Sequence, residues 1–247
     1  MDDHRLAAWL AVETGVQLRA MRDKAMSEAW SPWQLGDSGD MAAHHYLLDR
    51  LAEARPGDAV LSEEGSDDRL RLASERTWIV DPLDGSHDYS SGHSLDYAVH
   101  VALVVEGRPV AGAVSVPEHD EVYATDSFDA DAPELDPGRT EPVVITSRMQ
   151  ARWGIAIAEV LGGSALVAGS AGVKTMAVVR GDADVYVHPS GLYEWDACAP
   201  AAVAAAAGLA VCDIAGNALE YNKDYPVIRG FIVARPRFLE PVLETLR

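Results

Sequence analysis

Hydrophobic residues near the start of the chain recur at helical spacing, with few helix breakers between them. They predict a long helix over residues 3–28 and a second helix over residues 41–54, directly after Asp40. Two short apolar runs follow, at residues 59–61 and 78–80, and each continues straight into acidic residues. These runs predict buried strands that carry carboxylates at their ends.

The middle of the chain predicts a hairpin, and the remainder predicts alternating strands and helices. Residues 97–105 and 110–116 flank Glu106-Gly107-Arg108-Pro109, and residues 121–125 predict a third strand. Residues 126–141 are rich in Asp, Pro and Gly, so we expect a loop between two lobes there. Beyond it we expect strands at 143–145, 165–168, 183–187 and 231–233, and helices at 149–161, 171–180, 195–207 and after Pro236.

Charge and composition disfavour several classes of protein. The chain has 39 acidic and 20 basic residues, a formal net charge of −19 that repels nucleic acid polymers and anionic membranes. No stretch approaches the roughly 20 apolar residues of a membrane span, and the first residues do not have the pattern of a secretory signal. Cys198 and Cys212 are too few for a disulfide framework. We therefore expect a cytoplasmic protein with two buried thiols.

Residues 81–86, Asp-Pro-Leu-Asp-Gly-Ser, carry the most chemical information. Two carboxylates three residues apart, across a turn stiffened by proline, can converge on one point, and the Leu83 carbonyl can face the same way. Mg²⁺ prefers several oxygen ligands in an octahedral arrangement. If a helix begins at Gly85 and Ser86, its free N–H groups face an anion. The pattern predicts cation ligands beside phosphate-binding amides; the alternative is an acidic turn that only caps a helix.

Two further acidic elements can complete such a site. Ser62-Glu63-Glu64 follows the strand before the motif, so Glu63 or Glu64 can add a carboxylate. Glu194-Trp195-Asp196 opens an alanine-rich helix, which places Asp196 in its first turn. The alternative for Asp196 is a carboxylate that only compensates the helix dipole, and the alternative for Glu64 is an exposed side chain.

Four elements, in order, resemble the inositol monophosphatase-like superfamily over about residues 33–216. Gly39-Asp40 is similar to the family's upstream aspartate, and Ser62-Glu63-Glu64 is similar to its Gly/Ser-Glu-Glu element. Residues 81–86 are similar to its Asp-Pro-Ile/Leu-Asp-Gly-Thr signature, and Trp195-Asp196 is similar to its Trp-Asp signature. The resemblance implies the αβαβα layers of a sugar-phosphatase fold. The first lobe, residues 1–140, would be α+β with a mostly antiparallel sheet, the second, residues 141–247, would be α/β, and the site would lie between them.

The resemblance also implies a Mg²⁺-dependent phosphatase in which metal-activated water attacks phosphorus. Asp40 or Glu63, with the Ser86 hydroxyl, would orient and deprotonate the water, and the Gly85 and Ser86 amides would hold the phosphate. Serine at position 86 departs from the family's usual threonine, but it keeps the hydroxyl. Inhibition by Li⁺ and a homodimer are implied as well. Two or three Mg²⁺ ions would be held by Glu63, Asp81, the Leu83 carbonyl, Asp84 and Asp196.

The substrate indicated by these residues is a nucleotide. Inositol-specific members carry an acidic residue where this chain has Pro189. Gly169-Ser170 followed by Lys174 resembles the nucleotidase branch, where a helix start and a lysine suit a second phosphate; the alternative is a helix cap with a surface lysine. We expect the substrate to contact Leu83, Asp84, Gly85, Ser86, Gly169, Ser170, Lys174 and Asp196.

The resemblance to the nucleotidase branch implies removal of the 3'-phosphate of 3'-phosphoadenosine 5'-phosphate to give AMP, the 3'(2'),5'-bisphosphate nucleotidase reaction of sulfate assimilation. Tyr193 and Trp195 are candidates for a wall against adenine, although each is more often a core residue. Inositol monophosphatase or fructose 1,6-bisphosphatase activity is the alternative within the family. Outside catalysis, the alternative is a binding protein that keeps the metal site, and a nuclease is disfavoured by the charge.

Overall fold

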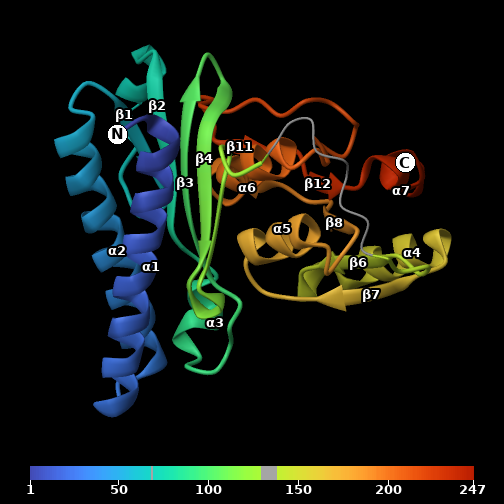
Figure 1. The fold of residues 1–247 in the computed structure, drawn as a ribbon, viewed down its shortest axis with the longest axis horizontal. Coiled ribbons are helices and arrows are strands. Elements are labelled where there is room, and N and C mark those ends of the chain that lie inside the picture. Colours follow the sequence, from blue (N-terminus) through green and yellow to red (C-terminus); the bar gives the residue numbers. More distant parts are fainter. Residues whose placement is uncertain (68, 129–137) are drawn as a thin grey trace.

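The computed structural model describes residues 1–67, 69–128 and 138–247, and they form five alternating layers of helices and sheets (Figure 1). The helices are α1 (Asp3–Ser27), α2 (Pro32–Ala54), α3 (Ser86–Ser90), α4 (Ala151–Leu161), α5 (Ala171–Arg180), α6 (Glu194–Ala206) and α7 (Leu239–Leu246). The layered αβαβα class expected from the sequence is confirmed.

The first sheet has the strand order β1-β2-β3-β4-β5, with β1 parallel to β2 and the other pairs antiparallel. Helices α1 and α2 cover its outer face (Figure 1). The hairpin and the third strand expected here are confirmed, and the β3–β4 turn is Glu106-Gly107. The strands are β1 (Ala59–Ser62), β2 (Arg76–Asp84), β3 (Ala98–Val105), β4 (Arg108–Val116) and β5 (Glu121–Ala124).

The second sheet has the order β10-β12-β8-β6-β7 and contains both parallel and antiparallel pairs. Helices α5 and α6 lie between the two sheets, and α4 and α7 lie beyond the second (Figure 1). Its strands are β6 (Val143–Thr146), β7 (Ser164–Val167), β8 (Val185–His188), β10 (Ala210–Cys212) and β12 (Phe231–Ala234), and β9 (Leu192–Tyr193) pairs separately with β11 (Val227–Ile228).

One hydrophobic core joins the two sheets through α5 and α6. It includes Ile79 and Val114 of the first sheet, Met176 of α5, and Tyr186 and Phe231 of the second. Residues that come from both sides of the expected loop at 126–141 therefore pack together. Residues 129–137 of that loop lie outside the described residues.

The predicted start of the second helix is wrong. Helix α2 begins at Pro32, not after Asp40, with Ser31 as a cap that accepts the N–H of Gln34. Gly36 and Gly39 lie inside the helix, and a Cβ at Gly39 would lie 2.7 Å from Cε1 of Tyr89. The two glycines therefore allow α2 to approach α3 closely, and they do not end the helix.

Two composition-based expectations can be compared with the structure. Both cysteines, Cys198 and Cys212, are buried free thiols. Among the described residues, no helix combines the length and apolarity needed to cross a membrane.

Candidate active site

A β-bulge in β2 turns two aspartates toward the same face of the first sheet. Asp81 pairs with His100 of β3, while Asp84 pairs with Ala98, so two residues of β2 lie opposite one residue of β3 between these pairs. Residues three apart in a regular strand point to opposite faces, and the extra residue of the bulge restores the same face. Pro82 suits this position because it has no N–H to place in the ladder.

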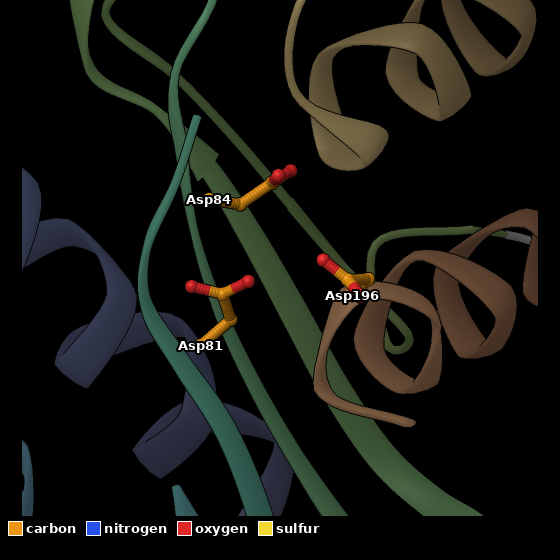
Figure 2. A group of neighbouring side chains, drawn as sticks. All are labelled: Asp81, Asp84 and Asp196. Carbon is orange, nitrogen blue, oxygen red and sulfur yellow. The ribbon is translucent and has the colours of Figure 1, made fainter. Parts of the chain in front are cut away.

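Asp81, Asp84 and Asp196 form one acidic cluster. Each offers a carboxylate oxygen, and the three oxygens lie within 4.8 Å of one another. Asp196 extends from the start of α6 toward the two aspartates of β2 (Figure 2). Its Oδ2 also accepts the N–H of Tyr193 at 3.0 Å. Stabilising the helix start and joining the cluster are therefore compatible roles for this residue.

The cluster brings three carboxyl groups together in the interior, which makes the ionisation of Asp81 and Asp196 unfavourable. Burial raises the pKa of Asp81 well above its ordinary value, and the neighbouring charges of Glu63 and Asp84 add to the effect. Burial, followed by the charges of Asp84 and Glu63, raises the pKa of Asp196 to about 7. Within the described residues, the buried Oδ2 of Asp81 has no hydrogen-bond partner. An unpaired oxygen in an all-carboxylate cluster fits a hard divalent cation such as Mg²⁺.

Asp84 is held differently from its two neighbours. Burial acts to raise its pKa, but the contact with His100 and the hydrogen bond from Ser170 hold the pKa below its usual range. Within the described residues, the polar contacts of its carboxylate all go to Oδ2. They come from the Ser170 hydroxyl at 2.5 Å, the Gly172 N–H at 2.7 Å and Nε2 of His100 at 3.2 Å.

Helix α3 begins directly after Gly85, as the motif predicted. Gly85 has φ 91°, and a Cβ there would lie 2.5 Å from the carbonyl oxygen of Asp96. Only glycine fits both the conformation and the space. Ser86 and Asp40, the residues expected to orient water, line one cavity of about 570 Å³ together with the exposed Trp33.

Asp40 and Glu63 both have raised pKa values. Burial, with the charges of Glu64 and Asp37, raises the pKa of Asp40 to about 7. Glu63 is exposed as a residue, although loss of hydration at its carboxyl and the nearby charges of Asp84 and Glu64 raise its pKa to about 7. Glu63 stays outside the 4.8 Å group, so its role as a cation ligand remains a prediction. Glu64 is exposed.

Lys174 is buried, which rules out the alternative of a surface lysine. It is 3% exposed, and its ammonium donates to the carbonyl oxygens of Gly169 and Ser170, in the loop before its own helix. Burial lowers its pKa to about 8. Because the Gly172 N–H at the start of α5 donates to Asp84, this helix start already holds one of the protein's own carboxylates. A second phosphate at this place stays a prediction.

Three residues of the site were missed by sequence reasoning. His100 is fully buried between Asp84 and α6. Asp96 accepts the N–H of Gly169 at 2.9 Å, and a Cβ at Gly169 would lie 2.1 Å from Oδ2 of Asp88. The available signal for His100 was a lone ionisable residue in an otherwise apolar strand. Asp88 and Asp96 gave no signal distinct from an exposed acidic loop.

A polar network supports the start of α6. The buried carboxylate of Glu194 accepts the N–H groups of Asn222 at 2.6 Å and Lys223 at 3.1 Å. Asn222 Oδ1 accepts from Arg71 at 2.7 Å, and Arg71 is paired with Asp67 at 2.7 Å. Residues from both halves of the chain therefore hold Glu194, which lies two positions before Asp196.

Comparisons with known proteins find relatives that match most of the chain. The chain is 38% identical to the 3'-phosphoadenosine 5'-phosphate phosphatase of Mycobacterium leprae, over 100% of this chain and 94% of that protein. It is 31% identical to the 3'(2'),5'-bisphosphate nucleotidase CysQ of Escherichia coli K12, over 75% of this chain and 78% of that protein. Among solved structures, it is similar to CysQ from Bacteroides thetaiotaomicron, with a TM-score of 0.78 and 27% identity over 93% of this chain and 96% of that one.

The family comparison covers most of the chain. Residues 34–247 match the Inositol monophosphatase family, and this span includes the bulge, the acidic cluster and the network behind α6. The chain belongs to the inositol monophosphatase family.

Proposed function

We propose that this protein is a Mg²⁺-dependent 3'(2'),5'-bisphosphate nucleotidase of the cytoplasm. It would convert 3'-phosphoadenosine 5'-phosphate to AMP and inorganic phosphate, a step linked to sulfate assimilation. The observation that carries the proposal is the buried cluster of Asp81, Asp84 and Asp196. The names of the relatives, at 31–41% identity, support the choice of substrate.

Mg²⁺ would be held by the three aspartates of the cluster, with the Leu83 carbonyl and Glu63 as further ligands. When bound, it supplies charge neutralisation at the phosphoryl group and lowers the pKa of water. The protein's own part is to keep negative oxygens close together in the interior, where hydrogen bonds to one oxygen of Asp84 fix its orientation.

Asp40 and Ser86 would position the attacking water, since both line the same cavity. A general base is most effective when its pKa lies near the working pH, and the pKa of Asp40 is raised to about 7. Asp40 can therefore exchange a proton near neutral pH, while the Ser86 hydroxyl orients the water. The Gly85 and Ser86 amides would hold the phosphate.

The nucleoside would lie on the side of α5 and α6. In an in-line displacement the leaving group lies opposite the attacking water, away from Asp40 and Ser86. The Tyr193 ring stacks on Trp195, with centroids 4.5 Å apart and planes inclined by 6°. Tyr193 is 47% exposed, and its N–H binds Asp196. Its free face would stack against adenine, and Lys174 would reach the second phosphate by exchanging a carbonyl partner.

The experiment compares inorganic phosphate release from 3'-phosphoadenosine 5'-phosphate, inositol 1-phosphate and fructose 1,6-bisphosphate. Each substrate is tested with Mg²⁺ and with EDTA. We expect fast phosphate release only from the nucleotide, and only when Mg²⁺ is present. A clear preference for either sugar phosphate would leave the cation site in place but contradict the proposed substrate.

A further inference from the structure

His100 has an unusual position for a histidine. It is the only ionisable residue of β3, it is 0% exposed, and it faces Asp81 in the pairing with β2. Its Nδ1 lies 3.1 Å from the carbonyl oxygen of Trp195, and its Nε2 lies 3.2 Å from Oδ2 of Asp84. The ring therefore touches the residue before one aspartate of the cluster and a carboxylate oxygen of another.

The contact with Trp195 fixes the role of one ring nitrogen. A carbonyl oxygen only accepts, so Nδ1 must carry a proton and donate to Trp195. This bond joins β3 to the first turn of α6, one residue before Asp196. Nε2 then lies 3.2 Å from Oδ2 of Asp84, and it has no hydrogen-bond partner among the described residues. Histidines that ligate metals are oriented in a similar way, because the ring nitrogen that does not touch the metal donates to a backbone carbonyl or a carboxylate.

A glycine in α5 leaves room for the ring. A Cβ at Gly172 would lie 2.2 Å from Nε2 of His100 and 2.9 Å from Cβ of Ala98. Glycine is less favourable in a helix than alanine, so the close approach has a cost in helix stability. The same Gly172 donates its N–H to Asp84. The imidazole is thus enclosed by β2, β3, α5 and α6, the elements around the acidic cluster.

We propose that His100 is a positioning residue for the cation site. By binding the Trp195 carbonyl with Nδ1 and packing Nε2 against Oδ2 of Asp84, it sets the spacing between β2 and the start of α6. Asp84 and Asp196 then present their carboxylates to one cation. This inference rests on the proposed function, because it assumes that the acidic cluster binds a divalent cation.

Three substitutions separate the two contacts of the ring. His100→Asn places an amide near the position of Nδ1 and keeps a donor for Trp195, whereas His100→Gln places one near Nε2 and keeps the contact with Asp84. His100→Leu removes both. Val101→Ala is the matched control, because Val101 is the next residue of the same strand and is buried in the core on the opposite face. Mg²⁺ and Mn²⁺ affinities are measured by calorimetry, and stability by thermal unfolding in EDTA.

We expect His100→Leu to weaken cation binding by about 10–100-fold, the range for losing a partner behind a metal ligand. His100→Asn and His100→Gln should each recover part of the affinity, and Val101→Ala should lower stability while keeping the affinity. A folded His100→Leu variant with the cation affinity of the wild type would overturn the proposal. If His100→Leu does not fold, wild-type cation affinity in both His100→Asn and His100→Gln would overturn it. So would an equal loss in Val101→Ala.

Failure of the proposed function gives a different result. Wild-type protein that binds Mg²⁺ but releases no phosphate from the nucleotide would contradict the nucleotidase, while the calorimetric comparison would still test His100. Wild-type protein that binds no divalent cation would contradict both.

Discussion

The hydroxyl of Ser170 donates a hydrogen bond of 2.5 Å to Oδ2 of Asp84, a residue 86 positions earlier in the chain. Ser170 also accepts the N–H of Val173 and so caps α5. One side chain therefore stabilises a helix of the second half of the chain and orients a predicted cation ligand of the first. The start of α5, where an external anion could bind, holds the carboxylate of Asp84.

Two substitutions at Ser170 separate its capping role from its contact with Asp84. Replacing a serine cap by alanine costs about 0.5–2 kcal/mol, but replacing it by glycine costs only a few tenths. The positive φ of Ser170, 49°, favours glycine further. We expect Ser170→Gly to be more stable than Ser170→Ala in thermal unfolding, while both lose cation affinity by about 10–100-fold. If Ser170→Gly kept a higher cation affinity than Ser170→Ala, in parallel with its higher thermal stability, a direct role of the hydroxyl in cation binding would be contradicted.

Asp84→Asn should nearly abolish turnover while the protein stays folded. The amide is uncharged and a weaker ligand for a hard cation. We expect kcat to fall by more than about 100-fold, the upper range for losing only a partner behind a ligand. Asp120→Asn is the control, because Asp120 is exposed and its loss removes the same charge away from the site. Near-normal turnover of Asp84→Asn at saturating Mg²⁺ would show that the cation is bound elsewhere.

Cation binding should strengthen as the pH rises toward neutrality. The pKa values of Asp40, Glu63 and Asp196 are raised to about 7, above the roughly 4 of unfolded carboxyls. The folded, cation-free protein therefore holds extra protons between about pH 4 and 7, and its carboxyl contribution to stability falls as pH rises through that window. A cation must displace these protons, so its stabilising effect should grow over the same range.

The measurement is the difference in melting temperature between Mg²⁺ and EDTA at pH 5.5, 6.5 and 7.5. Burial lowers the pKa of His44 and of His188, and these groups stabilise the fold increasingly as pH rises. Their contribution is common to both conditions and cancels in the difference. We expect the difference to increase with pH, and a constant or decreasing difference would contradict proton displacement at the acidic cluster.

Tyr193→Ala should weaken nucleotide binding, whereas Tyr193→Phe should not. Stacking of a base on an aromatic ring is worth about 1–3 kcal/mol, so KM for 3'-phosphoadenosine 5'-phosphate should rise by about 5- to 150-fold. The phenylalanine variant keeps the ring that stacks on Trp195. Steady-state kinetics check the prediction. An unchanged KM in Tyr193→Ala would place adenine elsewhere, for example against Trp33 in the cavity of Asp40 and Ser86.

The predictable parts of the fold are those encoded by neighbouring residues. Helix α5 begins and ends where the pattern places it, and α6 begins one residue before its predicted start. The correct start of α2 could have been predicted from neighbouring residues, since serine before proline is a typical helix start. Gly36 and Gly39 argue locally against a helix, because the need for glycine at these positions comes from contact with α3, which is distant in sequence.

The parts of the site that were not predictable depend on pairing between distant segments. The motif at residues 81–86 indicated that Asp81 and Asp84 converge, but the cause is a bulge defined by the register with β3. The same register places His100 beside the cluster. The burial of Lys174 follows from the position of α5 between two sheets, which periodicity within the helix does not reveal.

The most direct test of the account is the identity of the product formed from 3'-phosphoadenosine 5'-phosphate. Purified protein is incubated with the nucleotide in Mg²⁺ or in EDTA, and nucleotides and inorganic phosphate are quantified by chromatography. We predict adenosine 5'-phosphate and an equal amount of inorganic phosphate in Mg²⁺, and neither in EDTA. Adenosine 3'-phosphate as the product, or unchanged nucleotide in Mg²⁺, would contradict the account.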